Sequence, residues 1–258
     1  MLNNLAIADR TTTLAQPTCS LPPLSGLRGW YDANAKVLES DCPIVPAADE
    51  SSVAVWKDIS GNGNDLIAFS KPAFKKNHSS KQNYIRFNGL DNCMQSKKLL
   101  QQSADGDCSA LIVFKMEPNQ TGPGINRLLS LELDNTNTNR LWIGESNNCL
   151  QIGIGDSSKF FSKHCIADGK VKLLTVIRTG KDSGTVKAYV NNELAIESNW
   201  KASNPLTIEE GPFQIGGDES NGFLNGDIGE VMMHGSALNE DQLRSVKNYL
   251  FAKWEINE

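Results

Sequence analysis

Oxygen-bearing side chains alternate along one short segment of this chain. Asp58, Ser60, Asn62 and Asp65 lie within the run Asp58-Ile59-Ser60-Gly61-Asn62-Gly63-Asn64-Asp65. Carboxylate, hydroxyl and amide oxygens are the ligands that calcium prefers, about six to eight at a time. The segment is therefore a candidate calcium site, and calcium is the one cofactor that the sequence suggests.

Two interpretations of this segment remain open. The first half matches the start of an EF-hand loop, but Phe69 stands where the bidentate glutamate would be, so an EF-hand is excluded. A simpler calcium loop is one interpretation. The other, which we favour, is a tight turn in which asparagine and glycine supply positive φ angles.

Aromatic rings next to polar groups are the second kind of candidate site, because a sugar packs on an exposed ring. Trp200 lies in the polar stretch Ser198-Asn199-Trp200-Lys201, and we expect it to be exposed. Trp142 and Tyr84 are further ligand-binding candidates, although Trp142 suits the core equally well. Trp30, Trp56 and Trp254 are expected to have structural roles in packing.

Glu230 lies on an apolar strand, next to Val231 and Met232. A buried carboxylate is costly unless it is paired or hydrogen-bonded. We therefore expect a structural role for Glu230. It either accepts hydrogen bonds from backbone amides of the Asp58–Asp65 loop or lies in water at a strand edge.

The six cysteines have no CxxC spacing, so a zinc site is not indicated. Cys149 and Cys165 flank a turn near Asp156-Ser157-Ser158 at similar distances. A hairpin there places them opposite each other, where a disulfide is feasible. Two reduced thiols are the favoured alternative for a chain without a recognisable secretory signal.

Short apolar runs recur along the chain, each bounded by Gly, Asn, Asp or Ser, with no helical pattern between them. This rhythm predicts an all-β fold with antiparallel sheets. The expected strands are Val53–Trp56, Tyr84–Phe87, Ala110–Met116, Leu128–Leu133, Leu141–Ile143, Leu150–Ile154, Val171–Arg178, Phe213–Ile215 and Ile228–Met233.

A hairpin is predicted around Asn191-Asn192. Val186 and Ala188 alternate with polar residues before the turn, and Leu194 and Ile196 alternate with Ala195 and Glu197 after it. A loop of three residues, with one Asn in the left-handed region, brings both apolar sets onto one face.

One helix is predicted, from Asn239 to Trp254. Asn239 is a suitable N-cap and Gln242 occupies the capping-box position. Its apolar stripe should lie on the outside or edge of the sandwich; the stripe comprises Leu243, Val246, Leu250 and Trp254.

Composition excludes several partners. The formal net charge is −5 and no basic stripe stands out, so no nucleic-acid interface is expected. No segment reaches the ~18 apolar residues of a membrane span.

Residues 1–24 are polar and end in Leu21-Pro22-Pro23-Leu24, which predicts an extended arm before a domain at residues 25–258.

Three segments together resemble the laminin-G-like, concanavalin A-like lectin jelly rolls. They are the Trp56–Leu66 loop, the strand from Gly226 to His234, and the closing helix with Tyr249-Leu250 and Lys253-Trp254. The resemblance covers about residues 27–256. It implies an antiparallel jelly-roll β-sandwich that binds sugars or proteins.

Some jelly rolls of this kind are glycoside hydrolases, which need two carboxyl groups about 5–5.5 Å apart. The glucanase pattern Glu-x-Asp-x-x-Glu has one partial match, Glu132-Leu133-Asp134-Asn135-Thr136-Asn137. Its last residue, Asn137, can be neither acid nor nucleophile. The sequence therefore predicts a protein that is not an enzyme.

The resulting hypothesis is a non-enzymatic lectin-like module that binds host-surface glycans. Its arm and length suggest a virion surface component, such as a phage capsid decoration or tail-fibre protein. In that picture the module is assembled in the host cytoplasm, is oligomeric or part of an assembly, and is docked on other virion proteins through residues 1–24. A bacterial surface or secreted adhesin is the alternative, and a glycoside hydrolase ranks below both.

Overall fold

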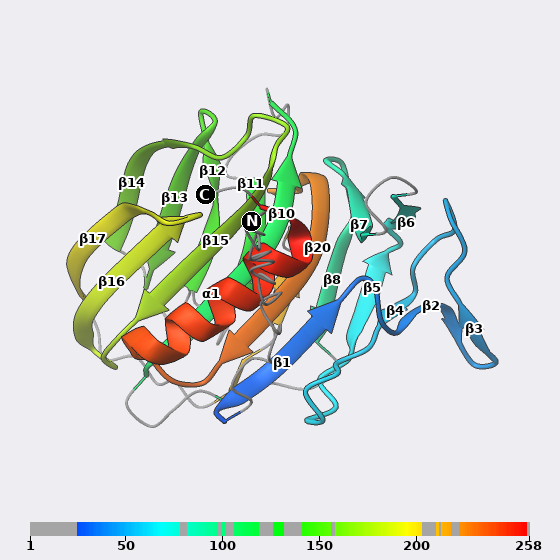
Figure 1. The fold of residues 1–258 in the computed structure, drawn as a ribbon, viewed down its shortest axis with the longest axis horizontal. Helices are drawn as coiled ribbons and strands as arrows, with labels where there is room; N and C mark the ends of the chain where they lie inside the picture. The colour runs from blue at the N-terminus through cyan, green and yellow to red at the C-terminus, as the bar shows by residue number, and fades with distance from the viewer. Residues whose placement is uncertain are drawn as a thin grey trace, which may run out of the picture.

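Two antiparallel sheets pack face to face in the computed structural model of this chain (Figure 1). The structure describes residues 25–77, 82–96, 100–101, 106–118, 126–131, 141–155, 158–202, 210–211, 213–217 and 222–256. The predicted arm, residues 1–24, lies outside the described residues. The predicted jelly-roll β-sandwich is confirmed.

The first sheet has the strand order β17-β16-β15-β10-β20-β7-β6, and β1 pairs with β20 beside this path. Its strands are β1 (Leu27–Asp32), β6 (Ala73–Lys76), β7 (Asn83–Asn88), β10 (Cys108–Met116), β15 (Val171–Arg178), β16 (Ser183–Val190), β17 (Glu193–Lys201) and β20 (Asn225–His234).

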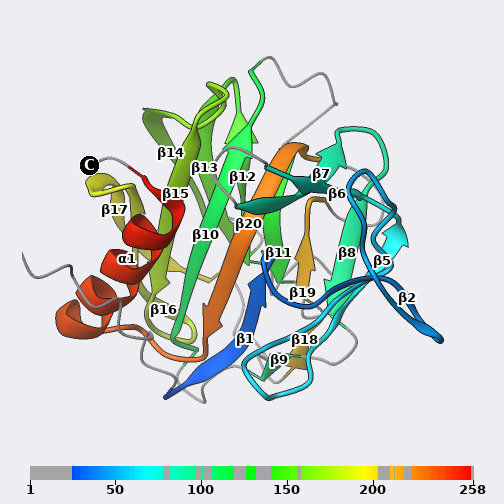
Figure 2. The ribbon, with the colours of Figure 1, turned by 45° about the vertical axis from the view of Figure 1, so that its right-hand side comes forward.

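The second sheet has the order β14-β13-β12-β11-β19-β8-β5-β4-β2-β3. Its strands are β2 (Val37–Asp41), β3 (Ile44–Pro46), β4 (Val55–Trp56), β5 (Leu66–Ser70), β8 (Cys93–Ser96), β11 (Asn126–Leu131), β12 (Leu141–Ser146), β13 (Cys149–Ile154), β14 (Ser158–Cys165) and β19 (Phe213–Ile215). A separate short pair joins β9 (Leu100–Gln101) to β18 (Glu210–Gly211). Figure 2 shows β8, β11 and β19 in a layer apart from β10 and β20.

Successive side chains of β10 point to opposite faces of the first sheet and so contribute to two different apolar clusters. Ile112 and Phe114 of β10 point into the core between the sheets. Leu111 and Val113 point the other way, into a second apolar cluster with the helix α1 (Glu240–Trp254). The near-continuous apolar run of β10 therefore reflects burial on both faces.

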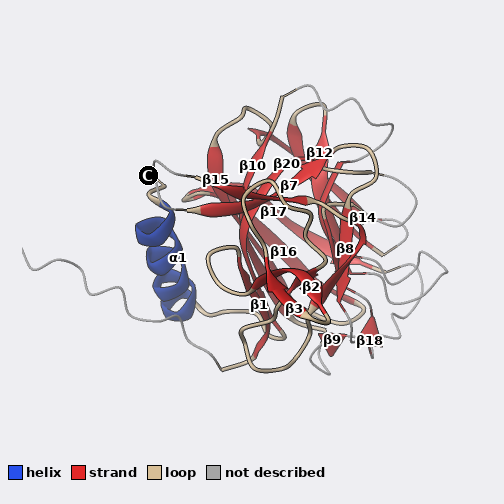
Figure 3. Cartoon of the chain, turned by 90° about the vertical axis from the view of Figure 1, so that its right-hand side faces the viewer, coloured by secondary structure: helices blue, strands red, loops and turns tan. Residues whose placement is uncertain are grey.

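The helix covers the outer face of the first sheet, as its single apolar stripe predicts (Figure 3). Val246, Leu250 and Trp254 are buried there. The capping box is present, since Asn239 Oδ1 accepts from the Gln242 amide and the Gln242 side chain accepts from the Asn239 amide. These two contacts fix where the helix begins.

The hairpin between β16 and β17 differs from the prediction. Its loop has two residues, because Val190 pairs directly with Glu193, and Asn191 has a left-handed φ of 54°. A bulge in β17, not a longer loop, restores the register, so Ala188 faces Ile196. Leu194 is left opposite Tyr189 and is 46% exposed. The prediction that Leu194 shares the core face with Ile196 is wrong.

His234, at the end of β20, is 1% exposed, and burial lowers its pKa to about 4. In the unfolded chain a histidine takes a proton near pH 6.5. Between these values the unfolded state binds the extra proton, so the free energy of unfolding falls as the pH falls.

We expect His234 to account for a loss of about 2 kcal/mol in the free energy of unfolding between pH 6.5 and pH 5. Urea unfolding of the wild type and of His234→Asn across this range measures the contribution, and NMR titration of the ring checks the pKa. Equal pH dependence of both proteins, with a ring that titrates near 6.5, would show the expectation to be wrong.

Candidate functional site

The loop from Asp58 to Asp65 joins β4 to β5 and is organised by the Asp58 carboxylate. Asp58 Oδ1 accepts from the backbone amides of Trp30 and Ser60 at 3.0 and 2.9 Å. Oδ2 accepts from the Asn64 amide at 3.0 Å. One carboxylate thus ties both ends of the loop to β1, which is why the chain turns here.

The other predicted calcium ligands are also engaged in the turn. Asp65 Oδ1 accepts from the Asp58 amide at 3.1 Å, and Oδ2 contacts Lys57 Nζ at 3.0 Å. Ser60 Oγ accepts from the amide nitrogen of the Asn62 side chain, which also donates to the Leu27 carbonyl. Gly61 and Gly63 supply positive φ angles of 92° and 71°.

This arrangement does not fit calcium well, since backbone amides and Lys57 already take up the carboxylate oxygens. In the part of the chain that the structure describes, no three His, Cys, Asp or Glu side chains come together as a metal site. The loop geometry is that of a structural turn, and calcium binding stays a prediction.

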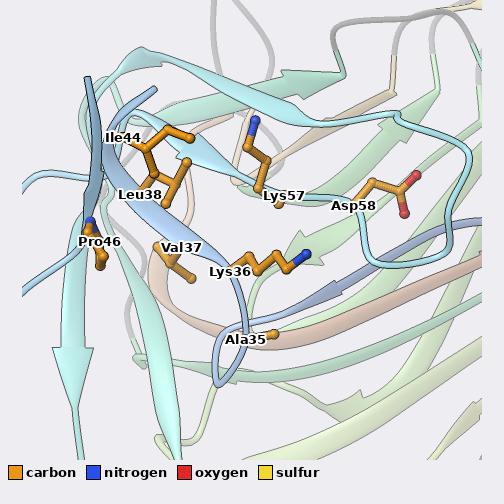
Figure 4. Close-up of a pocket in the computed structure, with 8 residues that line it drawn as sticks. All are labelled: Ala35, Lys36, Val37, Leu38, Ile44, Pro46, Lys57 and Asp58. Carbon is orange, nitrogen blue, oxygen red and sulfur yellow. The ribbon is translucent and has the colours of Figure 1, made fainter. Parts of the chain in front are cut away.

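A pocket of about 490 Å³ opens between this loop and the β2–β3 hairpin (Figure 4). Its volume is in the range of small-molecule sites. The lining residues are Ala35, Lys36, Val37, Leu38, Ile44, Pro46, Lys57 and Asp58. The hairpin supplies an apolar wall and the β4–β5 connection supplies a charged one.

The charged wall is pre-organised around Lys57. Its Nζ lies 2.8 Å from Asp41 Oδ1 and 3.0 Å from Asp65 Oδ2, and the hydrogen bonds that it donates to these two carboxylates raise the pKa of Lys57. Lys36 is exposed at the rim, and none of the described ion pairs includes it. Lys36 can therefore donate to a ligand without breaking an ion pair.

The apolar wall includes Ile44, whose side chain is 72% exposed. Val37 and Leu38 are buried behind it. An exposed isoleucine beside charged groups gives one surface for the C–H face of a ligand and another for its hydroxyl groups.

The pocket lies at one end of a row of side chains that crosses the second sheet. Leu38 pairs with Pro46 and with Val55, and the same register continues across the strands to Lys159. Directly paired residues point to the same face. Beyond Val55 the row is Ile67, Gln95, Gln214, Ser130, Trp142, Gly153 and Lys159.

The middle of this row is a chain of polar contacts. Ser130 Oγ donates to Gln214 Oε1 at 3.3 Å, and Gln214 Nε2 donates to Gln95 Oε1 at 3.4 Å. Ser130 and Gln214 are buried. Leu38 and Pro46, at the β2–β3 end of the row, are its members that line the pocket.

The three aromatic candidates present no common ring surface. Trp200 is 3% exposed, its Nε1 donates to the Thr179 carbonyl at 3.0 Å, and the Arg178 guanidinium lies 4.6 Å from its ring centroid. The prediction that Trp200 is exposed is wrong, because the ring closes the core beside Arg178 on β15.

Trp142 and Tyr84 are also packed and lie on different sheets. Trp142 is buried across Gly153, whose missing Cβ leaves room for the indole. Tyr84 is half-buried, with its ring 5.2 Å from that of Trp254, and burial raises its pKa to about 12. The structure does not bring the three candidates together.

Glu230 has the structural role that the sequence predicts, with different partners. It is fully buried, and its oxygens accept from Trp30 Nε1 and Trp254 Nε1, each at 2.6 Å, and from Lys253 Nζ at 2.7 Å. The prediction that it binds amides of the Asp58 loop or lies in water is wrong. Trp56, by contrast, packs edge-on against Tyr31 in the core, as expected.

Sequence reasoning missed the pocket residues Lys36, Ile44 and Lys57. Ile44 and Pro46 lie in the short run Pro43-Ile44-Val45-Pro46, which is too short for a periodic signal and contains two prolines, residues that are unfavourable in strands. The available signal was Lys57, directly between Trp56 and Asp58. A cation in that position needs a carboxylate partner, but only the fold shows that the partners include Asp41.

The comparisons with known proteins agree with this architecture. A family model described as the concanavalin A-like lectin/glucanases superfamily matches residues 111–244, just over half of the chain. The chain belongs to this superfamily. No curated protein sequence matches it.

Several solved structures share the concanavalin A-like fold at low sequence identity. Trypanosoma rangeli sialidase in complex with sialic acid aligns with a TM-score of 0.61 and 13% identity, over 93% of this chain and 35% of that one. This chain thus spans about a third of the sialidase.

Two further structures come from proteins that are described as interacting with glycans. Domain 4 of AbnA, a GH43 extracellular arabinanase from Geobacillus stearothermophilus, in complex with arabinotriose, aligns with a TM-score of 0.56 and 17% identity, over 86% of this chain and 97% of that one. Botulinum neurotoxin type C, whose cell entry depends on interaction with two ganglioside molecules, aligns with a TM-score of 0.53 and 13% identity, over 77% of this chain and 51% of that one.

Within the described residues, no helix is both long and apolar enough to cross a bilayer.

Proposed function

We propose that this chain is a non-catalytic glycan-binding module and that the pocket beside the β2–β3 hairpin holds a sugar ring. The observation that carries the proposal is the division of the pocket into two walls. Ile44 and Pro46 offer an apolar surface, while Lys36 and Lys57 offer ammonium donors. Sugars combine apolar C–H faces with hydroxyl groups, so such a site can contact both.

The known ligands of structures with this fold support the proposal. Domain 4 of AbnA aligns with this chain over 97% of the length of that domain, and it binds arabinotriose. Botulinum neurotoxin type C interacts with gangliosides. A saccharide is therefore the ligand class to test first.

The proposal includes no catalytic step. The carboxylates that could serve a hydrolase, Glu132 and Asp134, lie outside the described residues, as does Asn137. The pocket carboxylate Asp58 accepts three backbone hydrogen bonds, which suits a structural role.

A virion role, with residues 1–24 docked on other virion proteins, stays a prediction. Oligomeric assembly, the virion location and the adhesin alternative at the cell surface also stay predictions. Glycan binding by the pocket does not depend on which of them holds.

Binding to a saccharide array, followed by calorimetry with the best ligand, tests the proposed function. We expect Ile44→Ser to raise the Kd about tenfold, because burying an isoleucine side chain contributes roughly 1.5–3 kcal/mol and 1.4 kcal/mol is a factor of ten. Lys36→Gln should raise the Kd about threefold, with a larger effect on sugars that carry a carboxylate.

Two control variants match these changes in chemistry and exposure. Leu90→Ser alters an exposed apolar residue of similar exposure outside the pocket, 73% against 72%, and Lys71→Gln alters an exposed lysine. Both should bind like the wild type. Absence of binding to any neutral or acidic saccharide, or equal losses in the pocket and control variants, would refute the pocket as the glycan site.

A further inference from the structure

Cys149 and Cys165 are paired directly opposite each other on the neighbouring antiparallel strands β13 and β14. Opposed residues in such a pair have Cα atoms about 4.5–5.5 Å apart. Disulfides span Cα distances of about 4.4–6.8 Å. The backbone therefore already places the two cysteines within bridging range, with their side chains on one face of the sheet.

Contacts on both sides of the pair hold this register. On the side away from the β13–β14 turn, the Ile166 amide donates to the Asn148 carbonyl at 2.9 Å. On the other side a bulge in β14 is fixed by Ser162 Oγ, which accepts from the His164 amide at 3.0 Å. The His164 ring in turn reaches Glu193 on β17 at 3.2 Å. The two cysteines need no rearrangement of the strands to meet.

Exposure also separates this pair from the other described cysteines. Cys165 is exposed and Cys149 is half-buried, and both are free thiols in the structure. Cys93 and Cys108 are buried opposite Ser70 and Arg178, and burial raises the pKa of Cys108. Cys42 is exposed in the turn between β2 and β3. A soluble oxidant can reach Cys165, and Cys149 is then the adjacent thiol that resolves the product.

We propose that Cys149 and Cys165 form an intramolecular disulfide when the chain meets a disulfide oxidant such as oxidised glutathione. The Cys165 thiolate attacks the oxidant and releases one glutathione thiol. The Cys149 thiolate then attacks Cys165 Sγ and releases the second. Two protein thiols become one disulfide, and one oxidised glutathione becomes two reduced ones. This inference is independent of the proposed glycan binding.

The bond would fasten the edge of the second sheet. β14 is the terminal strand of that sheet, and β13 is its hydrogen-bonded partner there. Its Ser158 Oγ donates to the Lys201 carbonyl at the edge of the first sheet. A covalent link between β13 and β14 stabilises this side of the sandwich against opening, because the closed loop lowers the conformational entropy of the unfolded chain.

The full chain is equilibrated in glutathione buffers of increasing oxidised fraction, alkylated, and analysed by peptide mass spectrometry. We expect one cross-linked species that joins Cys149 to Cys165, and a melting temperature raised by roughly 6–10 °C over the reduced protein. Cys165→Ser should show neither change. Cys42→Ser, which removes another exposed cysteine, should show both.

Two outcomes overturn the proposal. One is complete alkylation of Cys149 and Cys165 in the wild type across all buffers, which requires no variant to fold. The other is oxidation through an intermolecular bond, seen as a covalent dimer on a non-reducing gel with no intramolecular cross-link.

Discussion

Glu230→Gln is expected to lower the free energy of unfolding by about 4 kcal/mol, the range in which breaking a buried ion pair falls. Glu230 Oε1 accepts from Trp30 Nε1, and Oε2 accepts from both Trp254 Nε1 and Lys253 Nζ. Glutamine keeps the shape but replaces one oxygen by an NH₂ group. In either orientation of the amide, at least one buried N–H donor faces another donor.

The charges of this cluster support the same expectation. Lys253 Nζ also lies 2.7 Å from Asp32 Oδ2, so the cluster balances one ammonium against two carboxylates. Burial raises the pKa of Glu230, and the nearby Lys253 opposes this shift. Burial alone would lower the pKa of Lys253, but Glu230 and Asp32 raise it. The Tyr249 hydroxyl also donates to Glu230 Oε1, at 3.4 Å, so the carboxylate that docks the helix on the sheet accepts from four donors.

Urea unfolding of Glu230→Gln against the wild type measures the effect, with Glu197→Gln as a matched control. Glu197 pairs with Lys187 on the surface at 2.8 Å, and an exposed pair of this kind contributes little. The control should unfold like the wild type. Equal stability of Glu230→Gln and wild type would mean that the cluster does not hold the helix.

Gly229→Ala is expected to lower the free energy of unfolding by about 3 kcal/mol, at the upper end of the cost of overpacking. A Cβ on Gly229 would lie 2.4 to 2.9 Å from three ring atoms of Trp254. The indole would have to move away from the sheet, and its Nε1 would lose the 2.6 Å contact with Glu230. One methyl group thus disturbs both the packing and the polar part of the helix interface.

A double-mutant cycle with Trp254→Leu isolates this cause. If the clash with the indole is responsible, Gly229→Ala should cost much less in the Trp254→Leu background than in the wild type. Costs that simply add would show that the glycine is needed for the backbone of β20 and not for the approach of the ring.

Local patterns were enough to predict most elements of the fold. The apolar runs from Ala110 to Ile215 predicted strands that the structure contains, and Asn239 with Gln242 predicted the start of α1. These signals depend on residues close in sequence, so the sequence expresses them directly. The sequence also predicted Cys149 opposite Cys165, but the register differs from the equal spacing assumed there. Ile154 pairs with Ser158, and a bulge in β14 then brings Cys165 opposite Cys149.

Contacts between distant residues could not be read in this way. The loop between β16 and β17 was predicted too long because a bulge at Ala195 corrects the register, and alternation does not distinguish a bulge from an extra loop residue. Trp200 looked exposed because its neighbours are polar. Its burial follows from Arg178, at the end of β15, and from Thr179, which directly follows that strand.

The sequence by itself determined that this protein is an all-β sandwich with one closing helix, because strand alternation, turn residues and helix caps act over a few residues. Only the tertiary structure decided what its polar groups do. Asp58 accepts backbone amides within a turn, Glu230 docks the helix, and the open pocket forms where the β2–β3 hairpin meets the β4–β5 loop. The role of a carboxylate or an aromatic ring depends on burial and on its partners. Those partners can lie far away along the chain, as Trp30 lies 200 residues from Glu230.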